Sequence, residues 1–189
     1  MQDFIISIRS IATLWILTAF LYPLLIFLIG QGIFPYQANG SILTNAQGDT
    51  VGSALIGQTF TTDEYFWSRP STIAYSEGED AAPTGISGGS NLAPGNPDLL
   101  DRVEAEAQRL RDAGIEPTAD LLYTSGSGLD PHISPAVAEA QVERIAESRG
   151  LSADEVRSLI VQNTDGRFLG VFGEPGVNVL PLNLALDSL

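Results

Sequence analysis

The chain has 189 residues, no cysteine and a formal net charge of −14. The lack of cysteine excludes disulfides, thiolate metal sites and cysteine nucleophiles, and the acidic balance argues against binding to nucleic acid or to anionic lipid headgroups. All nine basic residues are arginine, so lysine-dependent sites are also excluded, among them the phosphate-binding P-loop, a Schiff base and a Ser-Lys dyad.

The first predicted element is a membrane-spanning helix. Residues 11–29 read IATLWILTAFLYPLLIFLI and carry no charge, which is long enough to cross a hydrocarbon core of about 30 Å. Pro23 predicts a kink, and Trp15 and Tyr22 lie within the span rather than at its ends. That position indicates contact with protein instead of lipid. We therefore take Trp15, Tyr22 and Pro23 as candidate transmembrane contacts.

A cleaved signal peptide is the alternative to an anchor. The apolar region of a signal peptide spans about 7–15 residues and precedes a small-residue cleavage site. This run is longer, and residues 30–40 offer no such site, so we expect a retained anchor. Arg9 precedes the span and the next basic residue is Arg69, which predicts a cytoplasmic N-terminus and a domain outside. The expected division is an anchor over residues 1–31 and one extracytoplasmic domain over 32–189.

The remaining chain mixes predicted strands and helices, which indicates one mixed α/β (α+β) soluble domain after the single transmembrane helix. Residues 52–60 indicate a short strand and turn, and residues 65–71 an aromatic strand that Pro70 ends. Residues 76–97 are rich in Gly, Pro, Ser and Asn and predict a long loop.

The second half of the domain predicts capped helices. Asn96-Pro97 and Ser134-Pro135 each combine an N-cap residue with a proline at the first helical position, and Gly114 and Gly150 end the two helices. Residues 152–155 form a capping box for a further helix. Strands are indicated over 121–124 and 167–173, and residues 176–186 predict an extended C-terminal segment.

The stretch SGSGLDPHISP (residues 125–135) holds His132, the only histidine, two residues after Asp130. One hypothesis is an anchored, exported hydrolase in which Asp130 orients His132 and Ser125 or Ser127 is the nucleophile. The other is a rigid bend of glycines and prolines between a strand and a helix. Local spacing of two residues rarely gives the geometry of a triad, so we favour the bend and expect it to build a docking surface.

A second loop, ISGGSN, raises the question of nucleotide binding. Backbone amides in a Gly-Gly turn can hold an anion, which would make the chain a cytoplasm-facing nucleotide-binding chaperone. The alternative is a structured loop that uses glycine for positive φ, and we favour it because the motif is short. The weak nucleotide candidates are Ser87, Gly88, Gly89, Ser90 and Asn91.

Tyr65, Trp67 and Arg69 form an aromatic–arginine cluster of the kind enriched at interface hot spots. In a strand, Tyr65 and Trp67 would share one face, and one face is expected to pack in the core. No set of acidic residues and His132 has metal-ligand spacing, so we predict no metal site and no catalytic residue.

Taken in order, several stretches resemble the C subunit of the Kdp-type high-affinity potassium-transporting P-type ATPases. The matching stretches cover the anchor and nearly the whole domain: YPLLIFLIGQGIFPYQANGS, GSALIGQTF, YFWSRPS, SGGSNLAPGNPDL, SGSGLDPHISPAVAEAQVERIA and GEPGVNVLPLNLAL. No single stretch is decisive, but the ordered set is specific.

The resemblance implies a non-catalytic accessory subunit of the plasma (inner) membrane. It would hold together a channel-like potassium-binding subunit and an ATP-hydrolysing subunit, and act as a catalytic chaperone that raises the ATP affinity of the latter. ATP and potassium would be handled by the complex, with no cofactor bound to this chain. The candidate subunit-docking residues are Tyr65, Trp67, Arg69, Asp130, His132, Asn178 and Asn183.

Overall fold

The computed structural model describes residues 1–77 and 86–189 and divides into two compact units, Met1–Ile42 and Leu43–Leu189. Part of the long loop predicted over residues 76–97 therefore lies outside the described residues. Each unit is described by itself.

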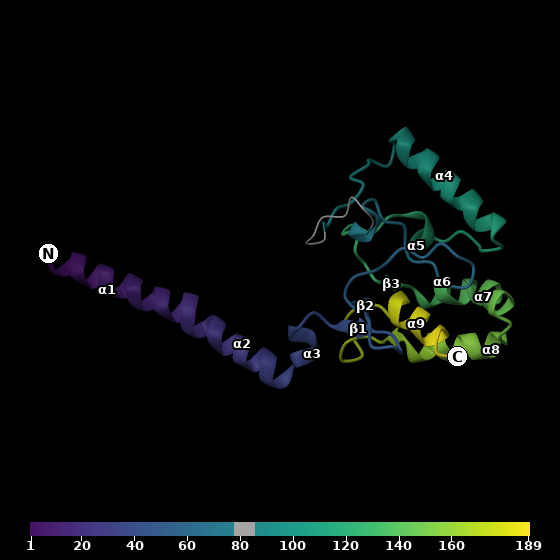
Figure 1. The fold of residues 1–189 in the computed structure, drawn as a ribbon. Coiled ribbons are helices and arrows are strands. Elements are labelled where there is room, and N and C mark those ends of the chain that lie inside the picture. The colour runs from purple at the N-terminus through teal and green to yellow at the C-terminus, as the bar shows by residue number, and fades with distance from the viewer. Residues whose placement is uncertain (78–85) are drawn as a thin grey trace. The chain divides into compact units, whose positions relative to one another are not determined.

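The first unit is a single long helix followed by one short turn of helix (Figure 1). Helix α1 (Gln2–Ile16), the π-helical turn η1 (Leu17–Leu21) and α2 (Tyr22–Ile33) run on without a break, and α3 (Pro35–Ala38) follows. The continuous helix has 32 residues and is apolar enough to cross a membrane. It ends two residues beyond the expected boundary at residue 31.

The irregularity expected at Pro23 takes the form of the π turn just before it. Proline has no N–H to donate to the preceding turn, so the helical ladder loses a hydrogen bond there. The Thr18 hydroxyl donates to the Leu14 carbonyl at 2.8 Å, which gives this side chain a partner within its own helix.

The second unit is the α+β domain that the sequence predicts. Its first hairpin pairs β1 (Ile42–Thr44) with β2 (Thr50–Ser53). The other elements are η2 (Ala74–Ser76), α4 (Pro97–Asp112), α5 (Ala119–Leu122), β3 (His132–Ile133), α6 (Pro135–Ala140), α7 (Val142–Arg149), α8 (Ala153–Gln162), β4 (Thr164–Asp165), β5 (Gly176–Asn178) and α9 (Val179–Leu186).

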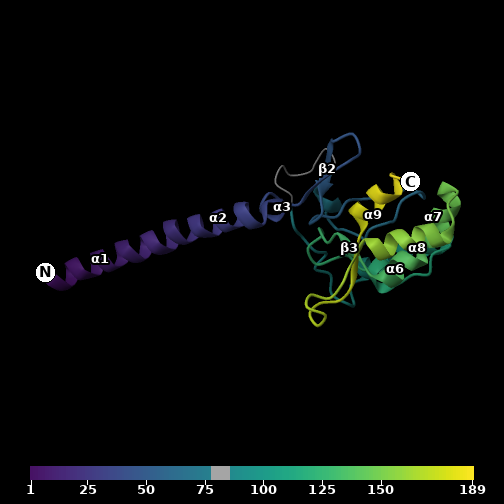
Figure 2. The ribbon, with the colours of Figure 1, turned by 90° about the horizontal axis from the view of Figure 1, so that it is seen from below.

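A small antiparallel sheet of order β3-β5-β4 lies against the C-terminal helices. In its register His132 faces Asn178 and Asp165 faces Gly176. Helices α6, α7, α8 and α9 surround one apolar core (Figures 1 and 2). Its most deeply buried large side chains include Phe66, Leu110, Leu121, Ile133, Ile145, Leu182 and Leu186.

The helix boundaries set by capping residues are confirmed. The Asn96 side chain accepts from the Asp98 N–H at 2.8 Å, and the Ser134 hydroxyl accepts from the Val137 N–H at 3.4 Å. Ser152 and Glu155 form the expected capping box, and Gly150 ends α7 with φ of 68°. The predicted helix after Ser134 is, however, divided at Gln141 into α6 and α7.

Four predicted extended segments are wrong. Residues 167–173 form a tight hairpin with one isolated bridge, between Phe168 and Phe172, instead of a strand. Residues 121–124 lie mostly in α5, because a short apolar run fits one helical turn as well as a strand. The C-terminal residues from Val179 form α9, since Pro181 falls in its first turn, where proline is tolerated. Residues 65–71 form no strand, and side chains rather than a neighbouring strand bind their backbone.

Candidate functional site

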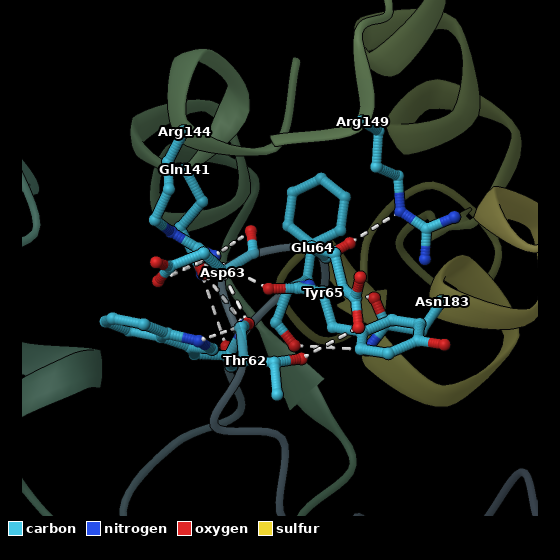
Figure 3. Close-up of polar contacts among 10 residues, drawn as sticks. Thr62, Asp63, Glu64, Tyr65, Gln141, Arg144, Arg149 and Asn183 are labelled. Carbon is cyan, nitrogen blue, oxygen red and sulfur yellow. Dashed lines mark hydrogen bonds and ion pairs between the residues drawn. The ribbon is translucent and has the colours of Figure 1, made fainter. Parts of the chain in front are cut away.

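The segment Thr62–Trp67 is held in place by amide side chains from distant helices (Figure 3). The Asn183 side chain accepts from the Phe66 N–H at 2.9 Å and donates to the Phe66 carbonyl at 3.1 Å. The Gln141 side chain does the same for Trp67, at 2.8 and 3.2 Å. Each amide therefore replaces the two bonds that a neighbouring strand would have made.

Two arginines of α7 complete this network. Arg144 donates to the carbonyls of Asp63 and Tyr65 and to the Gln141 side-chain oxygen. Arg149 donates to the Glu64 carbonyl at 2.7 Å (Figure 3), and it pairs with Asp187 at 2.7 Å. Because its backbone is bonded by four side chains, the segment is rigid without regular secondary structure.

Trp67 lies between guanidinium groups at the buried end of this segment. The Arg109 and Arg144 Cζ atoms lie 4.1 and 4.2 Å from the centre of its ring, a cation–π geometry. Burial lowers the pKa of Arg144 to about 10, so the group is still cationic at neutral pH. Trp67 is buried at 4% exposure and Asn183 at 2%, so their contacts are made inside this domain.

Three other predicted site residues come together in a second place, a cleft of about 380 Å³ that we call the His132 cleft. The Arg69 guanidinium lies 3.1 Å from Asp130, whose other carboxylate oxygen accepts from the His132 N–H at 3.0 Å. The ring of His132 lies 3.7 Å from Asp130 and 3.2 Å from Asp165. The cleft is lined by Arg69, Asp120, Asp130, His132, Ile133, Ser134, Asp165, Glu174, Pro175 and Gly176.

The charges of the cleft shift the two central pKa values in opposite directions. The carboxylates of Asp130 and Asp165 raise the pKa of His132 above its ordinary value. Contacts with His132, and the charge of Arg69, lower the pKa of Asp130. The cleft is therefore a polar recess in which His132 of β3 lies within ion-pair distance of Asp165 of β4, the two strands that flank β5.

The arrangement around His132 differs from the one that a serine nucleophile needs. The Ser125 hydroxyl accepts from the Gly128 N–H at 2.9 Å, and the Ser127 hydroxyl from the Leu129 N–H at 3.1 Å. Among the described residues, the polar partners of the His132 ring are the carboxylates of Asp130 and Asp165. The predicted cap of the following helix is present at Ser134, but the residues before the bend form α5 instead of a strand, and β3 lies within the stretch 125–135.

The ISGGSN loop packs against this glycine-rich bend. The Gly88 N–H donates to the Ser127 carbonyl at 2.8 Å, and the Ser87 hydroxyl donates to the same carbonyl at 3.0 Å. The Gly88 carbonyl accepts from the Thr72 hydroxyl at 3.0 Å. Both backbone polar groups of Gly88 are therefore engaged within the protein. Asn91 is exposed and has φ of 52°.

The other predicted site residues lie apart from the cleft. Asn178 is buried beside His132 in the sheet, and its side-chain NH₂ donates to the Ala54 carbonyl at 2.7 Å. The Tyr65 hydroxyl donates to Asp187 at 3.0 Å. Trp15 and Tyr22 project from the first unit's helix and are 67% and 63% exposed, as required for contact with a neighbouring helix.

Sequence reasoning missed Gln141 and Arg144, which bind the segment Thr62–Trp67. A usable pattern was present: Gln141 falls between Ala138 and Ile145 on the apolar face of the predicted helix. A buried polar side chain needs a hydrogen-bond partner, and this position therefore indicated a buried contact to backbone.

The apolar helix and the α+β domain define a single-span, membrane-anchored protein with a polar cleft on its domain. The family described as "K+-transporting ATPase, c chain" matches residues 4–188. The chain is also 68% identical over 187 residues to the "Potassium-transporting ATPase KdpC subunit" of Synechocystis sp., covering 99% of this chain and 98% of that protein.

More distant relatives match over the same extent. Subunit 2 of that name from Nostoc sp. is 58% identical over 98% of this chain and 94% of its own length. The Geobacter sulfurreducens subunit is 49% identical over 92% and 91%. The chain therefore belongs to the family of C chains of K+-transporting ATPases, accessory subunits of that enzyme.

Proposed function

We propose that this chain assembles and stabilises a potassium-uptake ATPase and raises the ATP affinity of its hydrolysing subunit. The observation that carries the proposal is the family match from residue 4 to residue 188, which includes both the helix and the domain. Relatives named as subunits of a potassium-transporting ATPase support the same role. The partners would be a channel-like potassium-binding subunit and an ATP-hydrolysing P-type subunit.

In this proposal the helix spans the plasma (inner) membrane with its N-terminus in the cytoplasm, and the domain lies outside. Trp15, Tyr22 and Pro23 would contact a neighbouring transmembrane helix. The π turn before Pro23 supports this, since irregular helix is tolerated in membranes where neighbouring helices supply contacts.

The His132 cleft would be the part of the domain that docks on a partner. Arg69, Asp130 and His132 are partly exposed in it, whereas Trp67, Asn178 and Asn183 are buried in the domain. Filling the cleft with His132→Trp should reduce the amount of partner that co-purifies. His132→Ala leaves the cleft open and should leave ATP-driven potassium uptake largely intact. Gln162→Trp, on the exposed side of α8, is the matched control.

An extracytoplasmic domain cannot touch cytoplasmic ATP, so any effect on ATP affinity must be a coupling between distant sites. Such a coupling requires an element with two states that both sites bias. In the proposed complex that element is the set of transmembrane helices that this chain's helix contacts. Removing the chain should therefore raise the KM for ATP more than it lowers kcat.

The first experiment is co-purification from native membrane in mild detergent with a C-terminal tag. A P-type ATPase and a potassium-channel-like protein recovered in fixed ratio would support the assembly role. A folded chain recovered alone would contradict it. With the complex in hand, equal ATP KM values with and without this chain would contradict the affinity role and leave assembly intact.

A further inference from the structure

The connection between β4 and β5 is a hairpin whose end is entirely apolar. We call Phe168, Leu169, Val171 and Phe172 the apolar tip. Their exposed fractions are 71%, 75%, 70% and 63%. Large apolar side chains gathered in one exposed place mark a contact with a membrane or another protein.

The hairpin presents the apolar tip on a defined backbone. Phe168 and Phe172 exchange backbone hydrogen bonds of 2.8 and 3.0 Å, and Arg167 pairs with Glu174 at 2.6 Å below them. Leu169 has φ of 53°, a left-handed conformation that is unfavourable for leucine and usual for Gly, Asn or Asp. Leu169 is therefore unfavourable in water for two reasons, its backbone conformation and its exposed apolar side chain. This indicates that another surface covers the tip.

The apolar tip belongs to a domain that a short connection ties to the apolar helix of the first unit. In both Figure 1 and Figure 2, this hairpin lies on the side of the domain opposite α7. Helix α2 ends at Ile33 and the second unit starts at Leu43. The connection over residues 34–42 can span at most about 30 Å, so the start of the domain at Leu43 stays within about that distance of the end of the helix.

The chemistry of the tip favours lipid over a protein surface. Protein hot spots are enriched in Trp, Tyr and Arg and poor in Leu and Val, whereas Phe and Leu are typical of segments in the membrane interface. The connection over residues 166–175 carries Arg167 and Glu174, which pair with each other, so its net charge is zero in a chain of net charge −14. The hairpin therefore escapes the repulsion that anionic headgroups exert on the rest of the domain.

We propose that the apolar tip inserts into the boundary between headgroups and acyl chains of the bilayer that the chain's own helix spans. Insertion gives the domain a second attachment to the membrane and limits its rotation about the connection 34–42. The proposal goes beyond the subunit role and does not depend on which side of the membrane the domain occupies.

The absence of cysteine makes the test direct, because one substitution creates a unique labelling site. Leu169→Cys, in the full chain, would carry an environment-sensitive fluorophore and be reconstituted into phosphatidylcholine vesicles, alone and in the assembled complex. Ser148→Cys is the matched control, since Ser148 is exposed on α7 at the opposite end of the domain. A nitroxide attached to the lipid near the headgroup serves as quencher.

We expect the lipid nitroxide to quench the label at position 169 several-fold more than the label at 148, in both preparations. Phe168→Asn with Phe172→Asn should abolish the difference without lowering the thermal unfolding midpoint. A label at 169 that remains open to a water-soluble quencher in both preparations overturns the proposal. So does a label shielded from both quenchers in the complex, which would assign the tip to a partner subunit.

Discussion

Asn183 shows how one side chain can substitute for a strand. Its amide provides one acceptor and one donor to the backbone of Phe66, and the residue is almost fully buried. Burial makes these bonds worth more than exposed ones, because a buried group that loses its partner has no water to replace it.

Replacing Asn183 with leucine should therefore be strongly destabilising although the volume is nearly kept. The substitution leaves the N–H and carbonyl of Phe66 buried without partners, which costs about 3 kcal/mol in the free energy of unfolding. Denaturant unfolding of the full chain in detergent measures it. The control Gln162→Ala, on an exposed helix face, should change stability by less than about 0.5 kcal/mol. Equal effects of the two substitutions would contradict the structural role of Asn183.

His132 should make stability depend on pH near neutrality. Asp130 and Asp165 raise the pKa of His132 in the folded protein. Protonation of the ring is therefore more favourable in the folded state than in the unfolded state. This contribution is complete below the unfolded pKa and is lost as pH rises through the folded pKa. The groups facing the ring across the cleft are Asp130 and Asp165, with Arg69, Asp120 and Glu174 also in its lining.

The measurement is the unfolding midpoint of wild type and His132→Gln at two pH values. The wild type's advantage should be larger at about pH 6, below the ordinary pKa of histidine, than at about pH 8.5. The same advantage at both values would mean that the ion pair with Asp130 and Asp165 contributes nothing.

At the scale of elements, two glycine-rich loops depend on one close approach. Gly128 has φ of 69°, and a Cβ added there would lie 2.7 Å from the Gly88 carbonyl oxygen and 2.6 Å from an Ile73 side-chain carbon. The bend before β3 and the ISGGSN loop can therefore pack together only if this residue is glycine.

Gly128→Ala should separate these loops and lower the free energy of unfolding by about 2 kcal/mol, through an unfavourable φ and overpacking. Gly126→Ala is a close control two residues away, where an added Cβ meets nothing within 4 Å. Thermal unfolding of both variants tests the difference, and an equally mild effect at Gly128 would contradict the tight packing.

The elements that the sequence predicted well are those with a local chemical cause. The caps at Asn96, Ser134 and Ser152 depend on residues within one turn, and so does the end of α7 at Gly150. The contact between Asp130 and His132 in the cleft could be predicted for the same reason, since the two residues are two positions apart in the sequence.

The elements that the sequence predicted wrongly depend on distant partners. The aromatic residues after Tyr65 favour a strand by propensity, but their backbone bonds come from Gln141 and Asn183. Helix α9 is apolar on nearly all sides, so its sequence carries no helical period that could separate it from an extended segment. Asp165 joins His132 only through strand pairing, which local patterns do not contain.

For the whole molecule, the distribution of arginines predicts the orientation in the membrane. Arg9 lies before the span, and every other arginine lies after it, from Arg69 onward. The positive-inside rule therefore predicts that the domain lies outside. Ser148→Cys should react with a membrane-impermeant maleimide in intact cells. Gln2→Cys should react only after permeabilisation. The reverse pattern would place the domain in the cytoplasm.

The side-chain bonds to residues 62–67 also determine when the domain can be completed during synthesis. Phe66 and Trp67 are bound by residues 117 and 74 positions later, and Arg149 bonds to Leu186 and Asp187 near the end of the chain. Because a ribosome makes the chain from its N-terminus, the helix can enter the membrane while this aromatic segment is still unbound. Only a chain translated past Asp187 can close the domain, so a subunit terminated before that residue should stay unfolded and open to proteases.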